Sequence, residues 1–473
     1  MRYVSTRGKA PDLGFDEVLL TGLARDGGLY VPAEWPRFGV EEWKALRGLS
    51  YVELATRIML PFVGDALSEE ELADLCSDAY ADFDHDAVAP LKQLDANSWL
   101  MELFHGPTLA FKDYALQLVG RLFDHVLRER GERLTIVGAT SGDTGSAAIE
   151  ACRDRDAIDI YILHPKGRTS EVQRRQMTTV DAPNVHNIAI DGTFDDCQDL
   201  VKGLFNDAAF RDEVNLSAVN SINWARILGQ IVYYAHAGVS LGAPDREIAF
   251  AVPTGNFGNV FAAYGAREMG LPVSQLVVGS NENDILTRFL DANDMSVRGV
   301  RPTLSPSMDI QVSSNFERLL FDLLDRDGEA TDHAMKSFRA SGELPLDEAR
   351  WQRATQLFSG GRFTDEETSA AIAGVLEATG ELVDPHSAIG ILAGWIARRD
   401  PSVPMVNVAT AHPAKFPDAV EAATGIRPPL PERLADLYER AERYSEMRNN
   451  LGDLQDMIRQ SNRAGAAGEG VKA

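Results

Sequence analysis

Short apolar runs alternate with segments of helical periodicity from about residue 91 onward, and this alternation limits the possible fold more than any other feature. Each run is long enough for a buried strand and too short for a core helix. The runs are LTIVGA (134–139), IDIYIL (158–163), VHNIAI (185–190), IAFAVP (248–253), QLVVGS (275–280) and VPMVNVAT (403–410). Because a helix between consecutive strands makes those strands parallel, the sequence predicts an α/β fold with open, mainly parallel sheets flanked by helices.

The first part of the chain, residues 1–90, predicts a helical N-terminal region instead. Residues 50–63 and 68–83 both have helical apolar spacing, and the second segment opens with a Ser-Glu-Glu-Glu capping signal.

Three further stretches follow. Residues 91–240 and 241–450 contain the predicted strands, so we expect two strand-containing domains. Within the second stretch, residues 283–380 are more helical and resemble an insertion. Residues 451–473 end in small and polar residues, so we expect a C-terminal tail.

Charge and cysteine content exclude several functional classes. The formal net charge is −25, and such a field repels nucleic acid and anionic membrane surfaces. Three cysteines (Cys76, Cys152 and Cys197) show neither a disulfide framework nor the spacing of a metal site, which fits the reducing cytoplasm. The sequence shows no signal peptide and no apolar run of about 18 residues that could span a membrane.

Two glycine-rich turns each follow a predicted strand and precede a predicted helix. They are TSGDTG (140–145) and TGNFGN (254–259). Free N–H groups at a helix start bind anions, and glycine lets the backbone approach a ligand closely. Neither turn has the pattern of a dinucleotide site or of a P-loop. One such turn could be an ordinary tight loop, but two in one chain favour a ligand site at the strand ends.

A single lysine, Lys112, lies in the mostly apolar segment ELFHGPTLAFKDYALQ (102–117). On its own it could be a solvated charge on an amphipathic helix. Together with two anion-binding turns it suggests a pyridoxal phosphate enzyme, in which a desolvated lysine forms a Schiff base and a nest of N–H groups holds the phosphate.

The chain resembles the longer threonine synthases of bacteria and fungi, which belong to the fold-type-II (tryptophan synthase β-like) pyridoxal phosphate enzymes. The resemblance covers most of the chain, and the matching motifs occur together and in order. They include MRYVSTRG, GLARDGGLYVP, HGPTLAFKDYALQ, GATSGDTGSAA, NSINWARILGQ, PTGNFGN, SPSMDIQVSSNFERLLFDLL, DPHSAIG and TAHPAKFPD.

The resemblance implies roles for particular residues. Lys112 would carry pyridoxal 5′-phosphate as a Schiff base, and Thr410 would meet its pyridine nitrogen. Ser141 and Thr144 would hold the substrate carboxylate. The cofactor phosphate would be bound mainly by backbone N–H groups of Gly255, Asn256, Phe257, Gly258 and Asn259.

Asp143 differs from the asparagine that many fold-type-II enzymes have at this position. That asparagine contacts the 3′-oxygen of the cofactor, and a carboxylate there would repel the phenolate unless the two shared a proton. Asp143 could instead cap the following helix. Both roles stay open at this point.

The substrate implied by the resemblance is O-phospho-L-homoserine. Asn220 and Arg226 match the residues that contact its phosphate. The segment HPKGRTSEVQRRQM (164–177) offers further cations, Lys166 among them, although it could equally be a solvated basic helix end.

The implied reaction joins O-phospho-L-homoserine and water to give L-threonine and phosphate, with Lys112 moving the protons. His105 could assist proton transfer or simply pack. The nearest alternatives are an O-phosphohomoserine phospholyase and a serine/threonine dehydratase. A non-catalytic homologue would be expected to lack the lysine or the phosphate turn, and both are intact. We expect a cytoplasmic monomer or homodimer that contacts neither nucleic acid nor membrane.

Overall fold

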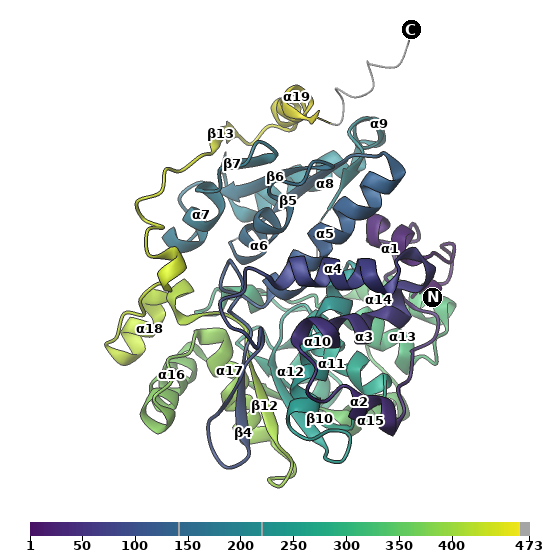
Figure 1. Cartoon of the computed structure of the whole chain (residues 1–473), viewed down its shortest axis with the longest axis vertical. Coiled ribbons are helices and arrows are strands. Elements are labelled where there is room, and N and C mark those ends of the chain that lie inside the picture. Colours follow the sequence, from purple (N-terminus) through teal and green to yellow (C-terminus); the bar gives the residue numbers. More distant parts are fainter. Residues whose placement is uncertain (141, 219–220, 464–473) are drawn as a thin grey trace. The chain divides into compact units, whose positions relative to one another are not determined.

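The computed structural model describes residues 1–140, 142–218 and 221–463 (Figure 1). The described chain divides into two compact units, which we call the first and the second unit. The first unit comprises Met1–Val18, Gly22–Phe111 and Ser221–Pro429, and the second comprises Leu19–Thr21, Lys112–Asn220 and Leu430–Ala473. These limits differ from the boundaries expected from the sequence, because the chain enters each unit more than once.

A six-stranded sheet forms the centre of the first unit, in the order β11-β10-β9-β12-β4-β3. Only β3 is antiparallel to its neighbour. The strands are β3 (Leu91–Gln93), β4 (Ser98–Glu102), β9 (Ile248–Pro253), β10 (Val273–Ser280), β11 (Phe358–Arg362) and β12 (Met405–Ala409).

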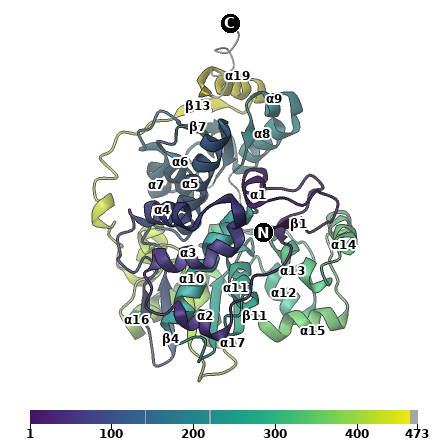
Figure 2. The same cartoon turned by 45° about the vertical axis from the view of Figure 1, so that its right-hand side comes forward.

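Helices cover the strands of this sheet. One of them, α17 (Pro385–Ala397), packs against β9, β10 and β12 through Ile389 and Ala393. Two others, α10 (Trp224–Ser240) and α11 (Gly258–Glu268), lie side by side (Figures 1 and 2). The remaining helices after α11 are α12 (Ile285–Ala292), α13 (Phe316–Leu323), α14 (Gly328–Ser341), α15 (Glu348–Leu357), α16 (Asp365–Thr379) and α18 (Pro417–Thr424), with short 3-10 turns η2 (Pro306–Met308) and η3 (Pro413–Lys415).

The N-terminal region is helical, as predicted. Ser50 and Ser68 start α3 and α4 through capping boxes, each accepting a hydrogen bond from a glutamate N–H three residues later. The region also contains a short antiparallel ribbon that the sequence did not predict. The elements of the whole N-terminal region are β1 (Tyr3–Ser5), α1 (Phe15–Thr21), β2 (Tyr30–Pro32), α2 (Val40–Ala45), α3 (Tyr51–Val63), η1 (Gly64–Ala66) and α4 (Glu69–Tyr80), and β1 pairs with β2 in the ribbon.

The second unit contains a five-stranded, fully parallel sheet in the order β13-β7-β6-β5-β8. Its strands are β5 (Leu134–Ala139), β6 (Ile158–Pro165), β7 (Val185–Asp191), β8 (Leu216–Ser217) and β13 (Ser445–Arg448). Its helices are α5 (Lys112–Arg130), α6 (Asp143–Cys152), α7 (Glu171–Thr178), α8 (Phe194–Asn206), α9 (Ala208–Glu213) and α19 (Leu451–Ser461), together with η4 (Glu432–Leu434).

Each apolar run that the sequence assigned to a strand is a strand, so the parallel α/β prediction is confirmed. The expected C-terminal tail is wrong for residues 451–461, since these form α19. Leu454 and Ile458 of this helix are fully buried in the core of the second unit.

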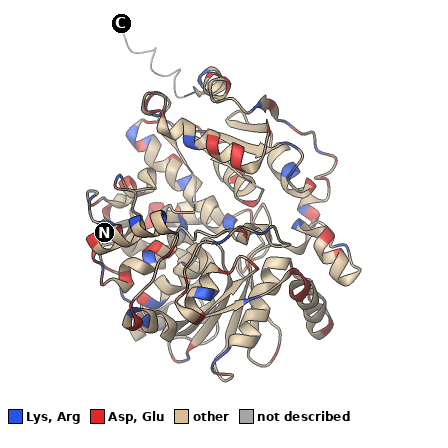
Figure 3. Cartoon of the chain, turned by 180° about the vertical axis from the view of Figure 1, so that it is seen from behind, with Lys and Arg blue, Asp and Glu red and all other residues tan. Residues whose placement is uncertain are grey.

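The acidic net charge is distributed over many elements, and acidic and basic residues intersperse along the helices in Figure 3. Among the described residues, no helix combines the length and the apolar character needed to cross a membrane.

Candidate active site

In the first unit, three neighbouring parallel strands have their carboxyl ends on the same side of the sheet. These are β4, β12 and β9, with β12 in the middle. Beyond their carboxyl ends lie the residues before Lys112, then Thr410, and then the TGNFGN turn. Ligands of open α/β sheets bind at such an edge, so three predicted cofactor segments are placed where the fold favours a site.

The segment before Lys112 is fixed to the end of β12 by backbone hydrogen bonds. Phe111 N–H donates to the carbonyl of Thr410 at 2.9 Å, and His412 N–H donates to the carbonyl of Leu109 at 3.0 Å. Leu109 is fully buried and has φ of 63°, which is unfavourable for a residue with a side chain. Lys112 follows Phe111 directly and is the first residue of α5. The hydrogen-bonded loop therefore fixes the position of the backbone just before Lys112.

The TGNFGN turn is closely packed against a second segment of the first unit. A Cβ atom on Gly255 would lie only 3.0 Å from the carbonyl oxygen of Ser307 and 3.1 Å from Cα of Met308. Phe257, with φ of 63°, precedes the first residue of α11. The turn therefore presents the N–H groups of a helix start, as a phosphate site requires.

Two buried side chains of the first unit have polar atoms without partners among the described residues: Asn259, the last residue of this turn, and Arg226, in the first turn of α10. Among the described residues, nothing hydrogen-bonds Nε or Nη1 of Arg226, or Nδ2 of Asn259. Burial lowers the pKa of Arg226 to about 10. The other amide atom of Asn259, Oδ1, accepts hydrogen bonds from the hydroxyls of Tyr233 and Tyr234. Buried donors of this kind fit an anionic ligand, because their desolvation is otherwise uncompensated.

Lys112 lies beside Asp143 in the second unit. The distance from Lys112 Nζ to Asp143 Oδ2 is 3.4 Å, and the two side chains are only 11% and 6% exposed. The solvated-charge reading of Lys112 is therefore wrong. The other oxygen of Asp143, Oδ1, accepts a hydrogen bond of 2.9 Å from Nε2 of Gln173.

This arrangement narrows the role of Asp143. Gly142, and not Asp143, occupies the N-cap position of α6, so the capping alternative does not hold. The carboxylate is oriented between an amide donor and the lysine amine. Contact with the 3′-oxygen of the cofactor stays a prediction. Gln173 had no signal in the sequence, because it is 30 residues away from Asp143 along the chain.

The TSGDTG turn is ordered by Thr140, whose Oγ1 accepts hydrogen bonds from the N–H groups of Gly142 and Gly145 at 3.0 and 2.9 Å. Thr144 is half-buried in the first turn of α6. Ser141 and Asn220, the other residues predicted to bind substrate here, lie outside the described residues. Of Ser141, Thr144 and Asn220, only Thr144 is described, and its binding role stays a prediction.

Basic residues of segment 164–177 form ion pairs with glutamates in the C-terminal part of the second unit. Lys166 Nζ is 2.6 Å from Glu446 and its side chain is 51% exposed. Arg174 makes a two-pronged ion pair with Glu442 at 2.9 and 3.0 Å. These contacts favour the alternative reading of a solvated basic helix end, and a substrate role for Lys166 stays a prediction.

His105 lies between two carboxylates of the first unit. Its Nδ1 is 2.7 Å from Asp84 and its Nε2 is 2.9 Å from Glu102. Burial lowers the pKa of His105, but the hydrogen bonds to Glu102 and Asp84 outweigh that effect, so the net direction is upward. With both ring nitrogens engaged, the imidazole is held in place, which supports the packing role.

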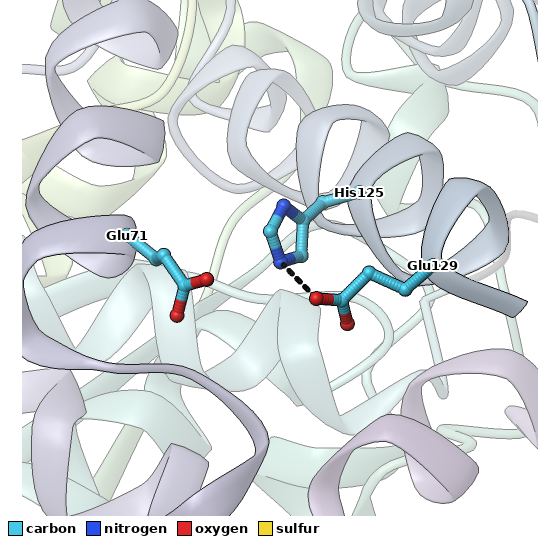
Figure 4. A group of neighbouring side chains, drawn as sticks. All are labelled: Glu71, His125 and Glu129. Carbon is cyan, nitrogen blue, oxygen red and sulfur yellow. Dashed lines mark ion pairs between the residues drawn. The ribbon is translucent and has the colours of Figure 1, made fainter.

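Figure 4 shows three other titratable side chains, which belong to different units. His125 and Glu129 lie one turn apart on α5, with 3.7 Å between Nε2 and Oε1. Glu71 completes the capping box of α4 in the first unit, where it accepts a hydrogen bond of 2.8 Å from Ser68 N–H.

Comparison with known families matches nearly the whole chain. Residues 2–80 match the family model "Threonine synthase N terminus", residues 85–385 match "Pyridoxal-phosphate dependent enzyme", and residues 387–458 match "Threonine synthase, C-terminal". A threonine synthase of Pseudomonas aeruginosa is 58% identical over 98% of this chain and 99% of its own length.

Solved structures agree with the family models. The structure of a PLP-bound threonine synthase from Brucella melitensis is 54% identical and superposes with a TM-score of 0.96, covering 98% of this chain and all of that one. The yeast threonine synthase structure is 38% identical, with a TM-score of 0.92 over 97% of this chain and 98% of its own. The chain therefore belongs to the threonine synthase family of pyridoxal-phosphate-dependent enzymes.

Proposed function

We propose that the protein converts O-phospho-L-homoserine and water to L-threonine and phosphate, the last step of threonine biosynthesis, with pyridoxal 5′-phosphate as its cofactor. The observation that carries this proposal is the buried amine of Lys112, paired with Asp143 and starting α5 directly after a loop bonded to Thr410. Membership of the threonine synthase family supports the same reaction.

The residues of the site fit the cofactor. The TGNFGN turn, with the unpartnered Nδ2 of Asn259, would hold its phosphate, and Thr410 would face its ring nitrogen. Asp143 would lie near its 3′-oxygen. When bound, the cofactor supplies an electron sink that stabilises negative charge on the substrate carbon.

Lys112 is the residue that moves protons. Its amine takes protons from the α- and β-carbons of the substrate and returns them where the product needs them. Asp143, 3.4 Å away, stabilises the ammonium form between these transfers. Thr144 and Ser141 would orient the substrate carboxylate.

Arg226 would hold the phosphate of the substrate, with Asn220 beside it. A guanidinium matches a phosphate with two parallel hydrogen bonds, and Arg226 is 3% exposed with donors to spare among the described residues. Binding of this kind stabilises the phosphate as it leaves the γ-carbon.

An O-phosphohomoserine phospholyase or a serine/threonine dehydratase would use the same lysine, so the product decides between them. We therefore expect purified protein with the cofactor to release phosphate and L-threonine in equal amounts. Release of phosphate with 2-oxobutyrate instead would identify a phospholyase.

The substitution Lys112→Ala tests the assignment of the proton carrier. It should lower kcat by at least about a thousandfold, because it removes the acid–base group. Lys92→Ala is the matched control, since Lys92 is a half-exposed lysine paired with Glu381, and it should keep wild-type kcat. Turnover of Lys112→Ala at the wild-type rate would contradict the mechanism.

We infer that the protein works in the cytoplasm as a monomer or homodimer. The three cysteines are buried and free, which suits a reducing compartment. Light scattering of the purified protein will give the oligomeric state, and a tetramer would contradict this inference.

A further inference from the structure

Asp384 of the first unit is a fully buried carboxylate at the N-cap position of α17. Both of its oxygens accept hydrogen bonds from a pair of donors. Oδ1 accepts from N–H and Oγ of Ser387, and Oδ2 accepts from N–H of His386 at 3.0 Å and faces its Nδ1 at 2.7 Å. Four donors around one buried carboxylate leave it no alternative orientation.

The histidine connects Asp384 to the predicted phosphate turn. His386 Nε2 accepts a hydrogen bond of 3.3 Å from Ser307 N–H, so its proton must be on Nδ1, where it donates to Asp384. Ser307 and Met308 in turn pack against Gly255, at the distances that leave no room for a Cβ atom. Asp384 therefore fixes the His386 tautomer that accepts the hydrogen bond from Ser307, and Ser307 packs against the TGNFGN turn.

The serine connects Asp384 to the strand end that carries Thr410. Ser387 Oγ accepts a hydrogen bond of 3.0 Å from Thr410 N–H and donates its own proton to Asp384. The hydroxyl proton is thus committed to the carboxylate, which keeps the oxygen available to Thr410.

We propose that Asp384 is a positioning residue that fixes both ends of the cofactor site at once, the phosphate turn through His386 and the ring-nitrogen residue Thr410 through Ser387. This inference rests on the proposed function, because it takes the TGNFGN turn and Thr410 as cofactor contacts. Asp384 itself touches neither; it acts only through its two neighbours.

The isosteric substitution Asp384→Asn tests this role through cofactor binding and not through stability. The new NH₂ group faces the donors of either His386 or Ser387, and each of these residues also donates one capping N–H group, so capping alone predicts some loss of stability. Only a positioning role also predicts weaker cofactor binding and a changed cofactor spectrum. Asp347→Asn is the matched control, since Asp347 is the N-cap residue of α15.

Two further variants each remove one of the two hydrogen bonds through which Asp384 would act on the cofactor site. His386→Leu removes the acceptor for Ser307 N–H, and Ser387→Ala removes the acceptor for Thr410 N–H. The apoproteins are titrated with pyridoxal 5′-phosphate and with pyridoxal, which lacks the phosphate, and the visible absorbance of each complex is recorded.

We expect His386→Leu to weaken binding of pyridoxal 5′-phosphate by about tenfold while binding of pyridoxal changes little. Ser387→Ala should weaken both to the same extent and shift the visible absorbance band. Asp384→Asn should show a loss of at least about tenfold, and Asp347→Asn none.

Wild-type affinities and spectra in Asp384→Asn would overturn the inference, as would equal losses for both ligands in His386→Leu. If Asp384→Asn does not fold, the two single-end variants decide alone. Failure of the wild-type protein to bind pyridoxal 5′-phosphate would instead contradict the proposed function itself.

Discussion

Two fully buried arginines of the first unit differ in how they are satisfied. Arg318 donates to the carbonyls of Tyr30 and Ile222, whereas Nε and Nη1 of Arg226 have no partner among the described residues. Burial lowers the pKa of both, to about 9 and about 10. Burying Nε and Nη1 without a partner among the described residues destabilises the folded state, and a ligand that accepts from them would recover that cost.

Arg226→Met should therefore raise the melting temperature of the protein without ligand while raising KM for O-phospho-L-homoserine by about tenfold or more. Arg318→Met provides the comparison and should lower the melting temperature, because it leaves two carbonyls unsatisfied. Thermal unfolding and steady-state kinetics measure both effects. A lower melting temperature for Arg226→Met would show that the guanidinium is already paired in the free protein.

His105 makes stability depend on pH. Its pKa is raised in the folded protein, so its charged form contributes stability that is fully present below the unfolded value of about 6.5. That contribution is lost as the pH rises through the folded pKa.

His105→Gln should consequently lower the melting temperature more at pH 6 than at pH 9. Asp84→Asn removes one of the two facing carboxylates and should make this difference smaller. Circular dichroism melts at both pH values test the expectation. An equal effect at both values would mean that the histidine only fills space.

Among the strands, those with both faces buried could be predicted from the sequence, whereas the strands at the edges of the sheets could not. β6 and β9 are buried along their whole length, so their sequences are continuous apolar runs. β13 has the sequence SEMR and β11 has the sequence FSGGR. Most residues of these two edge strands are partly or fully exposed, so their sequences contain no continuous apolar run.

The same reasoning separates the parts of the site that the sequence revealed from those it hid. Lys112 and the two turns stand out because glycine patterns and a lysine among apolar residues are local features. Gln173 and Asp384 act through partners that only the folded chain brings near, so no local pattern marks them.

Helix α19 is the element whose sequence was most misleading, since its polar residues suggested a tail. Leu454→Ala should cost about 2–4 kcal/mol of unfolding free energy, because the side chain is fully buried among the core residues of the second unit. Gln460→Ala, on the exposed face, should stay within about 0.5 kcal/mol. Urea unfolding gives both values. A negligible cost for Leu454→Ala would mean that α19 contributes no core packing and that the predicted tail was correct.

For the whole molecule, the division into units depends on the last part of the chain. The first unit has all six strands of its sheet by Pro429, whereas the second needs β13 and α19, which come later. A chain that stops at Pro429 should therefore lose hydrogen-exchange protection in β7 and α8 but keep it in β9 and β12. Equal loss in both sheets would contradict the division.

The pairing of β13 with β7 also bears on how the chain folds as it leaves the ribosome. β7 is synthesised more than 250 residues before its partner β13 (Val185 against Ser445). Until then its outer edge offers unpaired backbone groups, which can capture strands of other nascent chains. Expression of the protein should for this reason be sensitive to anything that delays or blocks its C-terminus, such as a fused tag or rare codons near the end of the message.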